Sequence, residues 1–110
     1  MALIKTPKEF FEKILPKRFN PDKAKNIDII VNIEILGKNG GRWVVIIKNK
    51  ELKIKEMEHN SPSISLKINE KDYLDIINGK LGGEEAFFSG KIKFKGNISQ
   101  ALRLKDSGLF

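Results

Sequence analysis

The chain contains no cysteine among its 110 residues. This absence excludes disulfides, thiolate metal sites and thiol catalysis, and it fits a reducing compartment. No stretch approaches the roughly 20 apolar residues that a membrane-spanning helix needs; the longest purely aliphatic run covers only residues 44–47. The N-terminus lacks a signal-peptide core, and the terminal Gly-Leu-Phe is no peroxisomal Ser-Lys-Leu signal. We therefore expect a cytoplasmic protein.

Side chains with catalytic potential are also scarce. His59 is the single histidine and falls in a predicted connection, and no serine lies in a nucleophile-elbow pattern. The Gly-rich stretch 79–83 lacks the Gly-Lys-Ser/Thr ending of a phosphate loop. The acidic pair Glu84-Glu85 opens a predicted helix, where carboxylates interact favourably with the helix dipole. These observations predict no enzyme activity, no cofactor and no metal site.

Arginine is scarce: only three of the 21 basic residues are arginines, so the net charge of +7 comes almost entirely from lysine. Such a charge attracts nucleic acid or an anionic membrane surface. The lysines alternate along predicted strands, as at Lys91, Lys93 and Lys95, which is typical of the solvated side of a sheet. Arginine is the residue preferred for base and phosphate recognition. A nucleic-acid partner is therefore disfavoured, while transient contact with an anionic membrane stays open.

The first third of the chain predicts a helix followed by paired strands. Thr6 and Glu9 form a capping box, and Pro16 is expected to end that helix. Apolar residues then recur every second position from residue 29, and turns at Asn39-Gly40 and at residues 49–50 predict a meander of three antiparallel strands. Residues 44 and 46 make the second face of the middle strand apolar too, so that face is either covered or lines a cavity.

The remainder predicts a fourth strand over residues 64–68, a helix capped by Asn69 and stopped by Gly79, a short helix, a fifth strand and a last helix capped by Asn97. The fold class is therefore α+β, with a five-stranded, mainly antiparallel sheet covered on one face by helices. The length suits one domain over residues 1–110.

The second half also holds more large apolar side chains than its short elements need for one core. Two interpretations remain open on the residues alone: simple packing, or helices that stand away from the sheet and line an apolar cavity. The residues concerned are Leu81, Phe87, Phe88, Phe94, Leu102, Leu104, Leu109 and Phe110.

Several motifs in this half form one pattern. Asn-Gly-Lys-Leu at 78–81 is followed by Ala-Phe at 86–87, by Gly-Lys-Ile-Lys at 90–93, by Gly-Asn at 96–97 and by Ala-Leu-Arg-Leu at 101–104. In these motifs the sequence resembles the sterol carrier protein-2 domain family, and the similarity extends over nearly the whole chain. The resemblance implies a hydrophobic tunnel between sheet and helices.

The resemblance further implies a non-enzymatic carrier of a fatty acid, acyl-CoA, isoprenoid or sterol-like molecule. One alternative is an accessory protein that presents an apolar intermediate to a partner enzyme, and another is a basic nucleic-acid-binding module. By position, Leu109 and Phe110 would close one end of the tunnel. The tunnel lining implied by the resemblance consists of Leu74, Ile77, Leu81, Phe87, Phe88, Phe94, Leu102, Leu109 and Phe110.

Overall fold

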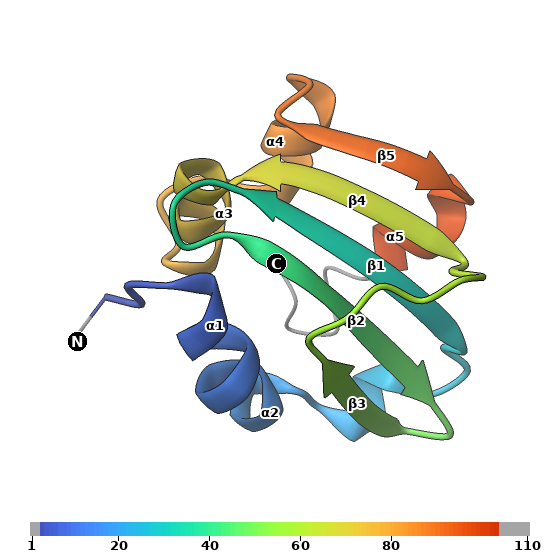
Figure 1. The fold of residues 1–110 in the computed structure, drawn as a ribbon. Coiled ribbons are helices and arrows are strands. Elements are labelled where there is room, and N and C mark those ends of the chain that lie inside the picture. Colours follow the sequence, from blue (N-terminus) through green and yellow to red (C-terminus); the bar gives the residue numbers. More distant parts are fainter. Residues whose placement is uncertain (1–2, 104–110) are drawn as a thin grey trace.

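The computed structural model of the chain describes residues 3–103 and places them in one five-stranded sheet with helices packed on one side (Figure 1). The predicted α+β class is confirmed. The helical elements are α1 (Pro7–Glu9), the π-helix η1 (Phe10–Ile14), α2 (Leu15–Arg18), the 3₁₀-helix η2 (Pro21–Ala24), α3 (Glu70–Ile77), α4 (Gly83–Phe88) and α5 (Ile98–Arg103). The strands are β1 (Ile29–Leu36), β2 (Gly41–Lys48), β3 (Glu51–Lys55), β4 (Ile64–Asn69) and β5 (Ile92–Gly96).

The spatial order of the strands is β3-β2-β1-β4-β5. The pairs β1–β2 and β2–β3 are antiparallel, so the predicted meander is confirmed. The pair β4–β5 is also antiparallel, whereas β4 joins β1 in parallel. Because β3 and β4 lie on opposite sides of the β1–β2 pair, the connection over residues 56–63 must cross the sheet, and Figure 1 shows it passing over one face. We call this segment the crossover.

The two faces of the sheet differ in chemistry. Alternate residues of each strand point toward the helices, and they are mostly Ile, Val and Leu buried in the core. On this helix face, Phe11 of η1 stacks on Trp43 of β2, with ring centroids 4.8 Å apart, and on Tyr73 of α3 at 5.8 Å. The opposite, open face carries mostly polar residues, but Ile30 and Ile46 pair on it across β1 and β2, and Val44 on the same face is buried. The predicted second cover of the middle strand is thus confirmed at Val44.

The first helix begins as predicted but does not end at Pro16. The Thr6 hydroxyl accepts a hydrogen bond from the Glu9 N–H at 3.1 Å, which caps the helix. Pro16 was expected to stop it, and this is wrong, because the chain continues as α2 to Arg18. The π-turn of η1, in which the Leu15 N–H donates to the Phe10 carbonyl, widens the helix just before the proline. The wider turn accommodates the missing N–H and the bulk of the ring.

The tight hairpin turn is at Asn49-Lys50 rather than at Asn39-Gly40. Asn49 and Lys50 have φ values of 53° and 63°, the left-handed pair that a two-residue hairpin requires. The β1–β2 connection is longer, and the Gly40 N–H donates to the Gly37 carbonyl at 3.1 Å. No helix within residues 3–103 is long and apolar enough to span a membrane.

Candidate functional site

The short helix α4 and the edge strand β5 bring three predicted site residues together. Gly90, with a φ of 83°, lets the chain reverse direction between these elements, and the Lys91 N–H donates to the Ala86 carbonyl at 2.9 Å. As a result the ring of Phe87 meets the ring of Phe94 edge-on at 5.7 Å. Phe88 meets Phe87 in the same way at 5.4 Å. The three rings form one aromatic cluster.

The aromatic cluster runs from the core to the surface. Phe87 and Phe94 are half-buried and pack against the core, whereas 76% of Phe88 is exposed. Phe88 is the most exposed large hydrophobic residue in the part of the chain that the structure describes. The cluster therefore extends from the core to solvent.

The other predicted lining residues lie in different places. Ile77 is fully buried in the core, and Leu81 is half-buried against it. Leu74 is half-buried and lines a separate hollow of about 520 Å³ with Ile4 and Leu36. The side chain of Leu102 and the whole of Leu109 and Phe110 lie outside the described part of the structure.

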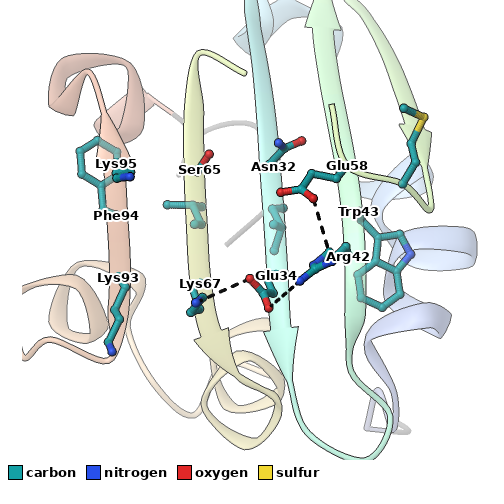
Figure 2. Close-up of a pocket in the computed structure, with 13 residues that line it drawn as sticks. Asn32, Glu34, Arg42, Trp43, Glu58, Ser65, Lys67, Lys93, Phe94 and Lys95 are labelled. Atoms are coloured by element: carbon teal, nitrogen blue, oxygen red, sulfur yellow. Dashed lines mark ion pairs between the residues drawn. The ribbon is translucent and has the colours of Figure 1, made fainter. Parts of the chain in front are cut away.

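A second hollow, of about 360 Å³, lies on the open face (Figure 2). A chain of ion pairs crosses its floor: Lys67 to Glu34 at 3.7 Å, Glu34 to Arg42 at 3.5 Å and Arg42 to Glu58 of the crossover at 4.0 Å. These groups are partly or largely exposed, so each pair contributes about 0–1 kcal/mol to stability.

Lys93 and Lys95 of β5 border the same hollow. The register places Lys93 directly opposite Lys67, and Lys95 opposite Ser65. Among the described residues neither Lys93 nor Lys95 forms an ion pair, and the one carboxylate near Lys67, that of Glu34, is shared with Arg42. The sequence predicts Lys93 and Lys95 as solvated strand residues. Their alternation was a usable signal, but only the register shows that three cations gather on two strands.

His59, the single histidine, has a structural contact within the crossover. Its Nδ1 accepts a hydrogen bond from the Ser61 N–H at 3.0 Å, and its backbone is held by Asn32 of β1. No group of three acidic or histidine side chains among residues 3–103 is arranged to hold a metal ion.

Comparison with known proteins identifies the family. The model of the SCP-2 sterol transfer family matches residues 9–107. The chain belongs to this family. The resemblance noted from the motifs is thereby confirmed, and the match includes the aromatic cluster and β5.

Relatives in the SCP-2 sterol transfer family have different lengths. The chain is 29% identical over 97 residues to rat hydroxysteroid dehydrogenase-like protein 2, covering 84% of this chain but 18% of the rat protein. It is 29% identical over 99 residues to non-specific lipid-transfer protein-like 1 of Caenorhabditis elegans, covering 86% of this chain and 83% of that protein. The chain thus spans about a fifth of the length of the first of these relatives and most of the second.

Solved structures show the same fold. The solution structure of palmitated SCP2L2 from Aedes aegypti superposes with a TM-score of 0.74 at 19% identity, covering 94% of this chain and 95% of that one. At this level of identity the likeness shows the fold alone. The order and pairing of strands described above is therefore the fold of the SCP-2 family.

Proposed function

We propose that this chain binds and carries an apolar, lipid-like molecule without catalysing a reaction on it. The observation that supports this most directly is membership of the SCP-2 sterol transfer family over residues 9–107. A relative of nearly the same length is named as a lipid-transfer protein, and a structure of the same fold was determined in a palmitated form. The cytoplasmic location expected from the sequence belongs to the same proposal.

The aromatic cluster is the part of the predicted lining that supports an entry route. Phe87 and Phe94 pack against the core and lead outward to the exposed Phe88. An apolar chain that follows these rings would enter between the helices and the sheet. We propose this space as the apolar tunnel, with Ile77 and Leu81 on its inner side.

The free energies agree with a carrier that must release its ligand. Burying an acyl chain of about 16 carbons at roughly 0.8 kcal/mol per CH₂ gives on the order of 12 kcal/mol. Association costs of roughly 4–15 kcal/mol offset much of this gain. At the lowest cost the net gain is about 8 kcal/mol, so binding should be micromolar at its tightest, which allows loading and unloading.

Titration with palmitate tests the proposal. Palmitate should bind at one site per chain and raise the melting temperature, because a ligand that binds only the folded state stabilises it. At a palmitate concentration of 100 times the Kd, the free energy of unfolding should rise by about 2.7 kcal/mol. Phe87→Ala should weaken binding several-fold, because Phe87 lies in the aromatic cluster. Phe19→Ala is the matched control, since Phe19 is also a half-buried phenylalanine packed on the core but follows α2 at the other side of the fold.

Native mass spectrometry of protein from cells should show lipid as added mass.

One result would contradict the carrier function, and another would contradict only the route through the aromatic cluster. One is an unchanged melting curve at saturating palmitate together with a shift by a short DNA duplex, which would favour a nucleic-acid module. The other is equal loss of affinity in Phe87→Ala and Phe19→Ala, which would mean that core stability, not the aromatic cluster, governs binding. Presentation of the ligand to a partner enzyme would use the same binding site, and the comparisons do not favour this alternative.

A further inference from the structure

The edge formed by α4 and β5 combines two features that the fold does not require. Strand β5 is the last strand of the sheet, and its alternation directs Phe94 to the helix face and Lys93 and Lys95 to the open face. Phe88, at the end of α4, is 76% exposed next to this strand. The same edge of the sheet therefore carries a large exposed aromatic residue and two lysines that form no ion pair with a described residue.

The lysines of β5 face another cation instead of a carboxylate. Lys93 is directly opposite Lys67 on the neighbouring strand, and like charges in this position repel. Glu34 bonds Lys67 but also bonds Arg42, so it offsets only part of the charge. Nothing else among the described residues neutralises Lys93 or Lys95. An anionic surface placed over β4 and β5 would remove this repulsion.

The opposite edge of the sheet provides a contrast. Lysines on edge strands often serve only to prevent edge-to-edge pairing, and β3 carries Lys53 and Lys55 in this manner. These two lysines lie opposite the apolar Ile46 and Val44, not opposite a cation. The acidic Glu51 lies in the same strand, and Glu56 follows it. Edge protection therefore explains β3, but it does not explain the charge opposition at β5.

We propose that the α4–β5 edge docks on an anionic lipid surface. Phe88 enters the interfacial layer, and Lys67, Lys93 and Lys95 lie against the acidic headgroups. This inference rests on the proposed function, because a carrier must take its ligand from a membrane and return it. Phe88 is in ring contact with Phe87, so docking at this edge places the start of the aromatic cluster at the membrane.

The chemistry favours a membrane over nucleic acid. The cations here are lysines, which act as point charges on headgroups, and arginine, which reads bases in a bidentate manner, is absent from β5. An exposed phenylalanine next to basic residues is the combination by which peripheral proteins bind the membrane interface.

Vesicle co-sedimentation at physiological salt tests the docking edge. The protein should bind vesicles that contain phosphatidylserine and should bind pure phosphatidylcholine vesicles far less. The double variant Lys93→Gln/Lys95→Gln should lower the partition coefficient roughly ten-fold or more, since each lysine near an anionic surface contributes about five-fold. Lys53→Gln/Lys55→Gln removes the same charge from the other edge and should change binding by about two-fold or less, because the Debye length is only about 8 Å.

Phe88→Ala supplies a second, independent measurement. It should weaken vesicle binding several-fold, and this loss should persist at high salt, where the lysine contribution disappears. Unchanged circular dichroism and Trp43 fluorescence establish that each variant is folded. Equal losses in the two lysine pairs, or equal binding to neutral and anionic vesicles, would overturn the docking edge. The docking edge would also be overturned if the protein bound no vesicles but bound a DNA duplex through Lys93 and Lys95.

Failure of the proposed function looks different. Palmitate titration without vesicles reports ligand binding alone. If palmitate binds but vesicle binding is insensitive to the α4–β5 variants, the docking edge is wrong and the carrier function stands. If palmitate does not bind but the variants behave as expected, the docking edge stands and the carrier function is wrong.

Discussion

Tyr73 lies fully buried among aromatic rings on the helix face. Phe10 meets it edge-on at 5.8 Å and Phe11 stacks on it at the same distance. Burial raises the pKa of the Tyr73 phenol well above its usual value of about 10, and the positive charge of Arg18 opposes this shift only in part. The phenol therefore stays protonated in the folded protein when an unfolded tyrosine would ionise.

This shift predicts a loss of stability in alkali. Below pH 10 the phenol is neutral in both states and its contribution to stability is complete. Above pH 10 the unfolded chain releases the proton first, so the free energy of unfolding should fall by up to about 1.4 kcal/mol per pH unit until the higher folded pKa is reached. Tyr73→Phe should remove this part of the decline. Urea titrations of both proteins at pH values on either side of 10 measure the difference.

Tyrosinate absorbance provides an internal check on the same prediction. Tyr73 is the single tyrosine of the chain, so the signal reports this residue alone. The absorbance should appear with unfolding instead of following an ordinary titration near pH 10. A normal titration curve in protein that is still folded would contradict the burial argument.

At the scale of elements, two asparagine side chains form hydrogen bonds to segments that belong to no strand or helix. Asn32 donates to the His59 carbonyl at 2.8 Å and accepts from the His59 N–H at 2.9 Å, which ties the crossover to β1. Asn78 makes the same pair of bonds with Ile4, at 2.9 Å and 2.7 Å, and ties the N-terminal segment to the end of α3. Each side-chain amide thus bonds both the N–H and the carbonyl of one residue, as the backbone of a neighbouring strand would.

Removing the Asn32 amide should loosen the crossover. Asn32→Ala leaves the His59 N–H and carbonyl without partners near the sheet, and should lower the free energy of unfolding by about 1–3 kcal/mol. Asn60→Ala, an exposed change in the same segment, should have little effect. Hydrogen exchange is the sharper measurement, because the His59 amide should exchange much faster in Asn32→Ala. Unchanged exchange at His59 would show that packing over Val44, and not Asn32, holds the crossover.

These elements also show what a single sequence can and cannot predict. The cap at Thr6, the stop at Gly79 and the three-strand meander depend on residues close in the chain, so local rules were sufficient. Pro16 does not end the helix, because the π-turn before it compensates for a residue that usually does. Asn32 resembled any outward polar strand residue, since its partner is 27 positions away.

The candidate site divides in the same manner. The aromatic cluster was predictable, because Phe87, Phe88 and Phe94 fall in elements joined by one short turn. Sequence position grouped Leu74 with them, but the three-dimensional path of α3 directs it to another hollow. The opposition of Lys93 and Lys67 depends on the β4–β5 register, which is not visible in either strand alone.

For the whole molecule, charge is distributed unequally between the two faces of the sheet. The helix face is apolar, while the open face carries most of the described strand lysines, and the net charge is +7. Repulsion among these cations destabilises the compact state. Most ion pairs among the described residues join partly or largely exposed partners and so stabilise it weakly, and only Asp72, paired with Lys91, is mostly buried. The repulsion should therefore outweigh the attraction.

This balance predicts that salt stabilises the protein. Moving from about 0.01 M to about 0.15 M salt shortens the Debye length from about 30 Å to about 8 Å, which screens repulsion across the open face. The melting temperature should rise by several degrees, as for a gain of about 1 kcal/mol in a domain of this size. Vesicle binding through the same lysines should fall over the same range, so salt should move the two measurements in opposite directions.

The lysine variants identify where the repulsion arises. Lys93→Gln/Lys95→Gln should be more stable than the natural protein at low salt and respond less to added salt, because it removes the charge opposite Lys67. Lys53→Gln/Lys55→Gln loses the same charge but no such opposition, so its gain should be smaller. A melting temperature that falls with salt would show that the ion-pair chain through Glu34 dominates instead. The expected result would mean that β5 retains cations at a cost in stability, as surfaces selected for binding commonly do.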